Sequence, residues 1–233
     1  MNDELDYIRH NCESIKERIA AAAIRAGRSP AEVKLIAVSK TVNAATAKKA
    51  LECGITDLGE NRVQEFCDKA DIIDVKCNWH LIGHLQTNKV KYLIDRIAMI
   101  HSLDSLELAA EIQKRAEKAA KQIEVLVQVN IASEDSKFGI SPEDTLGFIK
   151  SLAKMGNIKV KGLMTIAPLA ENPEDVRWVF AGLRKLLIDI SKENIDNINM
   201  DYLSMGMTND FETAIEEGSN MVRIGTAIFG KRN

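Results

Sequence analysis

The chain has 233 residues, of which 45% are hydrophobic and 28% charged, so it can bury a sizeable core and is not a disordered polymer. Its formal net charge is −3, without a basic tail or stripe, which argues against nucleic acid as the main partner. The acidic start lacks the apolar segment of a secretory signal, and no apolar run approaches the roughly 20 residues of a membrane-spanning helix. We therefore expect a cytoplasmic protein that binds neither nucleic acid nor membrane.

The cysteines are scattered without a CxxC pair, and we interpret them as reduced packing residues: Cys12, Cys53, Cys67 and Cys77. A zinc site is the alternative, because Cys77, His80 and His84 carry ligand types at close spacing. Their segment is typical of a strand that runs into a loop, and no fourth ligand is nearby. The sequence therefore predicts no metal site.

The chain begins with an amphipathic helix that ends near Gly27. Apolar residues at alternating steps of three and four predict its buried face: Leu5, Ile8, Cys12, Ile15, Ile19 and Ala22. Eight short apolar runs rich in β-branched residues follow and predict strands: Lys34–Ser39, Ile55–Gly59, Trp79–Gly83, Ala98–Ser102, Glu124–Asn130, Val160–Ile166, Tyr202–Gly206 and Met221–Gly225.

Helix patterns lie between the predicted strands. Ser141 and Asn172 each precede a proline and two acidic residues, the pattern of a capped helix start. Three glycines follow apolar-periodic stretches and suit helix C-caps: Gly54, Gly156 and Gly218. Strand–helix alternation requires parallel strands with right-handed crossovers. The sequence predicts an α/β fold, a single (β/α)8 TIM barrel with an extra N-terminal helix, as one domain over residues 1–233; a doubly wound open sheet is the alternative.

In such a barrel the active site lies at the C-terminal ends of the strands. Lys40 directly follows the first predicted strand, so its stem would lie in the mouth of the barrel. Partial desolvation and neighbouring cations lower the pKa of an ammonium group and supply the neutral amine that Schiff-base formation needs. The alternative is an ordinary surface lysine at a strand exit.

The loops after the last two predicted strands carry groups that suit a phosphate. Ser204 and Thr208 offer hydroxyls, and Gly225 and Thr226 open a short terminal helix whose free N–H groups favour an anion. Phosphate sites of these barrels recur at this place. Ordinary turn chemistry of glycine and threonine is the alternative.

The segment Gly225–Lys231 also has the spacing G-x-x-x-x-G-K of a nucleotide-binding P-loop. Arg232 replaces the Ser or Thr that this motif requires, and no room is left for its long helix. We reject the P-loop interpretation.

Arg223 lies two residues before Gly225, so both can face the barrel interior. A buried arginine needs an acceptor, which is either a structural carboxylate or a ligand atom. A Schiff-base lysine, a phosphate cradle and an arginine in one barrel mouth suggest pyridoxal phosphate. Lys40 would hold its aldehyde carbon, and Arg223 its ring nitrogen.

Several motifs, in order along nearly the whole chain, resemble those of the pyridoxal phosphate homeostasis protein family: Ala37–Thr41, Gly59–Asn61, His80–Gly83, Leu85–Gln86, Asn88–Lys89, Gly162–Thr165, Leu203–Thr208 with Asp210, and Val222–Gly230. The resemblance implies a barrel of the alanine racemase N-terminal-domain type, with pyridoxal 5′-phosphate held as a Schiff base on Lys40. It also implies that Asn61 and His80 lie near the cofactor ring, that Met164 packs beside it, and that Arg223 faces the ring nitrogen.

The resemblance further implies which residues hold the cofactor's phosphate: Ser204, Thr208, Gly225 and Thr226. The family often has serine at the position of Thr208, and the hydroxyl is retained here. The segment Asn130–Gly139, with Ser136-Lys137-Phe138-Gly139, also resembles the family, but a plain loop explains it equally well and its role stays open.

Two classes of function follow from the resemblance. In the first, the protein is a carrier in intracellular pyridoxal phosphate homeostasis that buffers the cofactor and can pass it to apo-enzymes. In the second, it is a racemase or decarboxylase of amino acids with low activity. An arginine at the ring nitrogen disfavours its protonation and weakens the ring as an electron sink, which favours the carrier.

Racemases of this type also use a tyrosine from an additional β-domain of the partner subunit. The chain ends with the barrel, and its tyrosines lie in predicted helices and a strand: Tyr7, Tyr92 and Tyr202. We therefore expect no robust catalysis, and a monomer, because the racemase dimer interface is missing. A cofactor-free Schiff-base aldolase that uses Lys40 on a sugar phosphate is a third hypothesis.

Overall fold

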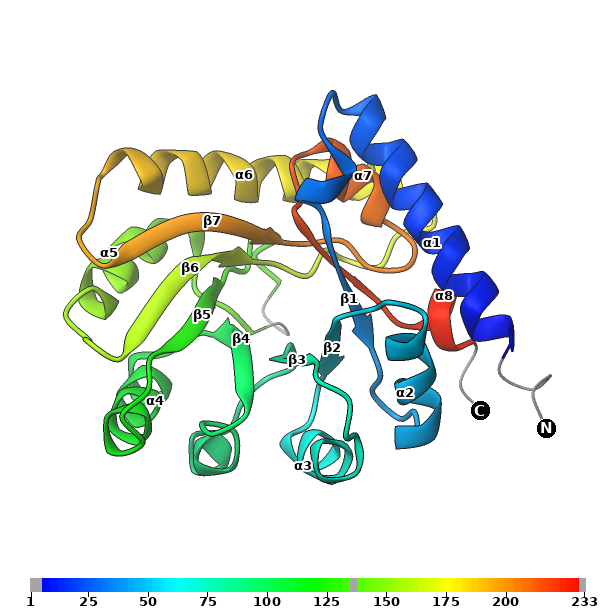
Figure 1. Ribbon diagram of the computed structural model, residues 1–233. Helices are drawn as coiled ribbons and strands as arrows, with labels where there is room; N and C mark the ends of the chain where they lie inside the picture. Colours follow the sequence, from blue (N-terminus) through cyan, green and yellow to red (C-terminus); the bar gives the residue numbers. More distant parts are fainter. Residues whose placement is uncertain (1–5, 135–137, 231–233) are drawn as a thin grey trace.

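The computed structural model describes residues 6–134 and 138–230, and its strands form one closed parallel barrel (Figure 1). The strands follow one another around the barrel in chain order: β1 (Lys34–Val38), β2 (Asp57–Glu60), β3 (Asn78–Leu81), β4 (Ile97–Leu103), β5 (Ile123–Gln128), β6 (Ile158–Met164), β7 (Ile198–Ser204) and β8 (Met221–Ile224). β8 pairs with β1, with Arg223 opposite Ile36, and this pairing closes the sheet. The predicted eight-stranded barrel is confirmed, and the open-sheet alternative is wrong.

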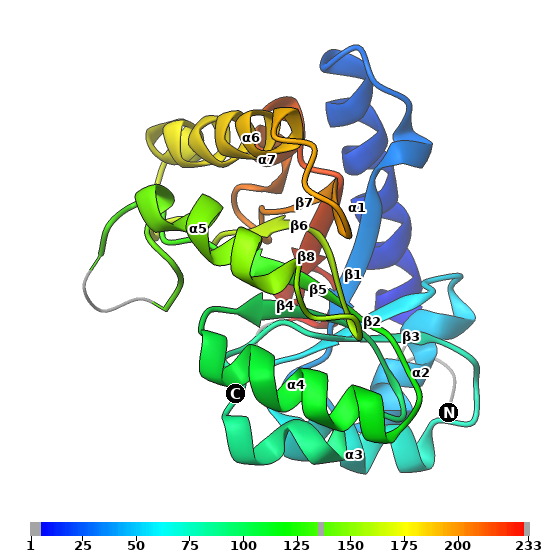
Figure 2. The same ribbon diagram turned by 90° about the vertical axis from the view of Figure 1, so that its left-hand side faces the viewer.

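Helices cover the outside of the barrel, and Figure 2 shows α3 to α6 following one another around it. They are α1 (Asp6–Arg25), η2 (Pro30–Glu32), α2 (Ala44–Glu52), α3 (Val63–Ile72), η3 (Thr87–Tyr92), α4 (Leu106–Lys118), α5 (Pro142–Leu152), η4 (Pro173–Val176), α6 (Arg177–Lys192), α7 (Phe211–Glu216) and α8 (Thr226–Phe229). The connection from β3 to β4, where we predicted a helix around Tyr92, contains only the short 3₁₀ helix η3. No helix in the described ranges is long and apolar enough to cross a bilayer.

The predicted helix ends are mostly confirmed. Ser141 Oγ accepts from the N–H of Asp144, and Asn172 Oδ1 accepts from the N–H of Glu174. Gly156 differs from the prediction, because α5 already ends at Leu152 and Gly156 is not among the glycines with positive φ. The helix does not need a left-handed glycine there.

The N-terminal helix α1 packs across one side of the barrel, beside α7 and α8 (Figure 1). The predicted apolar face is buried from Ile8 to Ala22; Leu5 lies outside the described residues. Asn11 Nδ2 donates to the carbonyl of Ile228 over 3.0 Å, so α1 holds the short helix that follows β8. The extra helix thereby fixes the segment that carries the predicted phosphate-binding residues.

The barrel interior has an apolar part and a polar part. A small cluster of buried side chains occupies the apolar part: Ile36, Met99, Leu126, Met164 and Met221. Side chains of β2, β3, β4, β7 and β8 bring polar groups into the same interior, all of them buried: Asp57, His80, His101, Ser204 and Arg223. Of these five polar residues, Arg223 lines the pocket described next.

Candidate functional site

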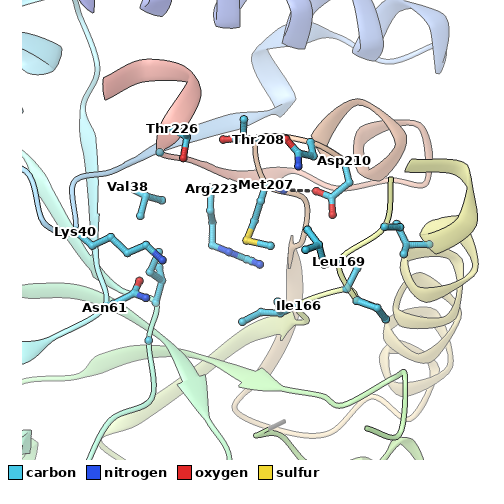
Figure 3. Close-up of a pocket in the computed structure, with 18 of the residues that line it drawn as sticks. Val38, Lys40, Asn61, Ile166, Leu169, Met207, Thr208, Asp210, Arg223 and Thr226 are labelled. Carbon is cyan, nitrogen blue, oxygen red and sulfur yellow. Dashed lines mark hydrogen bonds between the residues drawn. The ribbon is translucent and has the colours of Figure 1, made fainter. Parts of the chain in front are cut away.

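A cavity of about 740 Å³ opens at the C-terminal ends of the strands (Figure 3). Most of the predicted site residues line it: Lys40, Asn61, Thr208, Arg223, Gly225 and Thr226. Three do not, because they are buried in the barrel interior: His80, Met164 and Ser204. The strand ends therefore bring together the amine, the arginine and two of the hydroxyls that the sequence singled out.

Lys40 extends into this cavity from the turn that follows β1 (Figure 3). The N–H of Val42 donates to the carbonyl of Ser39 over 3.0 Å, which closes a turn with Lys40 and Thr41 at its corner. Thr41 has φ +61°, a conformation that glycine usually supplies at the third position of such a turn. The turn directs the lysine side chain into the barrel mouth and the next residue away from it.

Asn61 reaches the cavity because the chain after β3 passes very close to it. A Cβ atom on Gly83 would lie 2.4 Å from the carbonyl oxygen of Asn61, so only glycine allows this approach. Gly83 also lines the cavity, and its carbonyl accepts from Ser102 Oγ over 2.6 Å. Asn61 and Lys40 line the same cavity (Figure 3).

Arg223 is the buried cation of the site, with 4% of its surface exposed. Its Nη1 donates to Ser204 Oγ over 2.6 Å, and its Nη2 donates to the carbonyl of Thr165 over 2.9 Å. Burial lowers the pKa of Arg223 to about 10, and the charge of Asp210 opposes this shift. The guanidinium therefore stays protonated at neutral pH and is held by two hydrogen bonds at the wall of the cavity.

A chain of buried hydrogen bonds continues from Arg223 through the barrel. Ser204 Oγ lies 2.9 Å from His101 Nδ1, His101 Nε2 lies 2.9 Å from His80 Nδ1, and His80 Nε2 lies 2.9 Å from Asp57 Oδ1. One assignment of protons satisfies every member: each group donates toward the next, from Arg223 to Asp57. The chain thus joins a cation below the cavity to a carboxylate at the opposite end of the barrel.

Burial, neighbouring charges and hydrogen bonds shift the pKa values of His101 and Asp57 in this chain. Burial, then His80 and Arg223, hold the pKa of His101 well below its ordinary value, so this ring stays neutral. Burial alone would raise the pKa of Asp57, but hydrogen bonds from His80 and Thr56 outweigh it and keep that pKa below its ordinary value. The ionised carboxylate fixes the order of donors along the chain.

The hydroxyls of Thr208 and Thr226 lie together at one side of the cavity, next to Gly225 (Figure 3). Asp210 shapes this side, because its Oδ1 accepts from the N–H of Met207 over 2.5 Å and closes the loop after β7. Burial raises the pKa of Asp210, while the hydrogen bond from Met207 opposes the shift. Two hydroxyls beside open backbone suit a phosphate group.

Several residues of the cavity were not predicted from the sequence. His84 stacks on Phe138 with ring centroids 3.9 Å apart, and its Nδ1 lies 3.5 Å from Asp104. Ile166, Leu169 and Met207 form an apolar rim, also visible in Figure 3. Position just beyond a strand end was the available signal for all of them except Phe138. Phe138 reaches the cavity from a segment whose residues Ser136 and Lys137 lie outside the described part of the chain.

The structure describes part of the segments that carry the zinc-site and P-loop alternatives. Within residues 6–134 and 138–230, no group of three His, Cys, Asp or Glu side chains could hold a metal ion. His80, the middle residue of the zinc alternative, contacts Asp57 and His101. The last residues of the P-loop alternative, Lys231 and Arg232, lie outside the described residues.

Comparisons with known proteins show the family to which the chain belongs. The family model described as "Alanine racemase, N-terminal domain" matches residues 4–233. A pyridoxal phosphate homeostasis protein of Aquifex aeolicus is 48% identical over 95% of this chain and 98% of its own length. The protein of the same name from Escherichia coli K12 is 37% identical over 100% of this chain and 98% of its own.

Solved structures of other proteins contain the same barrel. PipY of Synechococcus elongatus with PLP bound is 32% identical, with a TM-score of 0.80 over 93% of this chain and 100% of its own. An alanine racemase of Clostridium difficile has a TM-score of 0.79 at 18% identity; this chain covers 57% of it, and the likeness shows the fold alone. The chain belongs to the alanine racemase N-terminal domain family and, within it, to the pyridoxal phosphate homeostasis proteins.

Proposed function

We propose that this protein binds pyridoxal 5′-phosphate reversibly as a Schiff base on Lys40 and thereby buffers the cofactor in the cytoplasm. The observation that carries the proposal is the convergence of Lys40, Arg223 and the Thr208 and Thr226 hydroxyls on one cavity (Figure 3). The bound PLP in PipY and the name of the curated relatives support it. The cofactor supplies an aldehyde that condenses with an amine and releases water.

Each part of the cofactor has a matching group in the cavity. Lys40 supplies the amine, while Thr208, Gly225 and Thr226 suit the phosphate. Arg223 suits the ring nitrogen as a fixed donor, because two of its N–H groups are already held by Ser204 and Thr165. The cavity of about 740 Å³ holds such a group with room to spare.

The three buried residues take a different part in the proposal. Ser204 and His80 hold Arg223 in place through the hydrogen-bond chain. Met164 belongs to the apolar cluster of the barrel interior. It lies two positions before Ile166 in the sequence, and Ile166 lines the cavity. Asn61 lines the same cavity as Lys40 and suits a contact with the cofactor ring (Figure 3).

The carrier function is favoured over a racemase or decarboxylase by Arg223. A permanently charged donor at the ring nitrogen disfavours protonation of that nitrogen and weakens the ring as an electron sink. The guanidinium is buried and stays charged at neutral pH, so this effect persists over the physiological range. Delivery of the cofactor to apo-enzymes, and a monomeric state, are parts of the same proposal.

The test is the visible absorption spectrum of the purified protein, followed by borohydride reduction and mapping of the modified peptide. We expect a yellow protein with the adduct on Lys40, no adduct in Lys40→Ala, and full modification in a control, Lys114→Ala, at an exposed position of α4. A full Schiff-base spectrum in Lys40→Ala would refute the assignment. A colourless protein that pyridoxal phosphate leaves unmodified, but that sugar phosphates label on reduction, would favour the aldolase alternative.

Delivery is tested by mixing the loaded protein with a pyridoxal-phosphate-dependent apo-enzyme and following the return of that enzyme's activity. Faster activation than by the same concentration of free cofactor supports transfer between the two proteins. A rate equal to that of spontaneous cofactor release, measured with a non-protein trap, restricts the function to buffering. Sedimentation velocity of the loaded protein tests the monomer.

A further inference from the structure

The turn that carries Lys40 is held from outside the barrel by charged side chains that do not line the cavity. Glu65, in the first turn of α3, accepts from the N–H of Thr41 through Oε2 over 2.5 Å. Lys69, one helical turn later, donates to the carbonyl of Ser39 over 2.5 Å. The residues on both sides of Lys40 therefore have their backbone fixed by the same helix.

These contacts are anchored in a buried ion pair. Lys69 Nζ lies 2.6 Å from Glu60 Oε1, and their side chains are 7% and 0% exposed. Ser39 Oγ donates to the same carboxylate oxygen over 2.6 Å, while Glu60 Oε2 is buried without a hydrogen-bond partner. A buried charged pair is weak support for stability on its own. Here the pair with Glu60 fixes the ammonium group of Lys69, which donates to the carbonyl of Ser39.

The turn 39–42, which these contacts hold, has a backbone conformation that Thr41 at its corner does not favour. Thr41 is β-branched and has φ +61°, which is costly for such a residue unless its surroundings impose it. Glu65 supplies that constraint, because its carboxylate fixes the N–H of Thr41. An acidic residue in a first helical turn ordinarily stabilises only its own helix. Glu65 instead reaches across to the turn of the neighbouring strand.

We propose that Glu65, with the buried pair Glu60 and Lys69, positions Lys40 for Schiff-base formation by holding the turn 39–42 in its strained conformation. The inference rests on the proposed function, because it assigns a role to residues behind the cofactor-binding amine. Glu65, Glu60 and Lys69 are positioning residues, since they act through the backbone of Ser39 and Thr41. None of them lines the cavity.

The primary variant is Glu65→Ala, because Glu65 is partly exposed and, although it lies 3.5 Å from Lys69 Nζ, its loss leaves Lys69 paired with Glu60. The matched control is Glu107→Ala, which also removes an acidic residue from a first helical turn, in α4. Loss of a charge-assisted hydrogen bond in a partly exposed site should slow Schiff-base formation about fivefold in Glu65→Ala. Glu65→Gln, whose amide oxygen can still accept from Thr41, should recover most of the rate. The assay is the absorbance change after pyridoxal phosphate is added to the apo-protein.

A second measurement does not involve the cofactor. Amide hydrogen exchange of Thr41 and Val42 should accelerate in Glu65→Ala and stay unchanged in Glu107→Ala. A fourth variant tests the strain, because Thr41→Gly accepts positive φ without help from Glu65. Adding Glu65→Ala to Thr41→Gly should therefore slow Schiff-base formation less than Glu65→Ala slows it in the wild type.

The outcomes separate this inference from the proposed function. If the wild type forms no adduct on Lys40, the proposed function fails. The positioning role of Glu65, Glu60 and Lys69 then fails with it, whatever the exchange data show. If the wild type forms the adduct and Glu65→Ala reacts as fast as Glu107→Ala, the positioning role is overturned and the proposed function stands. Slower reaction with faster exchange, and rescue by Glu65→Gln, supports the inference.

Discussion

Removal of one hydroxyl, in Ser204→Ala, should destabilise the protein rather than weaken its hold on a phosphate. Ser204 is fully buried, and its Oγ accepts from Arg223 over 2.6 Å and lies 2.9 Å from His101. The substitution leaves a charged donor and a ring nitrogen without their partner. A hydrogen bond to a charged group contributes about 1.5–3 kcal/mol and a neutral one about 1 kcal/mol. Arg223 also faces the cavity, where a water molecule can replace part of the lost hydrogen bonding. We therefore expect Ser204→Ala to lower the free energy of unfolding by about 2–3 kcal/mol in total.

Urea unfolding followed by circular dichroism measures this change as a shift of the midpoint at constant m-value. The thermal midpoint should fall by roughly 5–10 °C for a chain of this length. The control is Ser102→Ala, since Ser102 is equally buried but donates to a single carbonyl, that of Gly83. It should cost about 1 kcal/mol. The reasoning is refuted if the two variants lose the same stability, and a selective loss of cofactor affinity in Ser204→Ala would instead support the phosphate contact that the family resemblance implies.

Three further changes test other parts of the site. Because burial holds the pKa of His101 well below its ordinary value, only the unfolded chain takes up this proton, so stability should fall as the pH is lowered from about 7 to about 5. His101→Gln should flatten that slope in urea titrations at several pH values; an unchanged slope would contradict the buried neutral ring. Gly83→Ala should cost about 2 kcal/mol of unfolding free energy through its clash with Asn61, whereas Gly147→Ala, with open space around it, should stabilise α5 by about 0.5–1 kcal/mol. Arg223→Ala should raise the pKa of the bound cofactor's ring nitrogen in a spectrophotometric titration, and an unchanged titration would count against its role.

Strand positions show where local patterns stop being informative. β7 begins at Ile198, four residues before the predicted start at Tyr202. The prediction missed these residues because the outward-facing Asn199 and Asp201 are polar and interrupt the apolar run. β3 ends at Leu81 rather than at Gly83. The spacing of apolar residues in a sequence reflects which residues are buried. A strand whose outer face is exposed to solvent in its first half therefore lacks the continuous apolar run of a strand that is buried on both faces.

The assignment of site residues shows the same limit at the level of side chains. The alternation of strand residues placed Arg223 and Gly225 on the same side of the chain, and both line the cavity. It did not distinguish a side chain that lines the cavity from one that lies a layer below it. His101 carried no motif, yet it joins His80 to Ser204. Its partners are 21 and 103 residues away in the chain, and such distances leave no local signature.

The sequence by itself determined the alternation of strands and helices, the parallel direction of the strands, and the place of Lys40 at the end of the first strand. These follow from periodicity, from cap residues and from the way parallel strands must be connected. Only the tertiary structure decided that Arg223 is held by Ser204, and that Glu65 holds the turn of Lys40. Such pairs arise when barrel closure and helix packing bring separate segments to hydrogen-bonding distance, and that registration is a property of the whole fold.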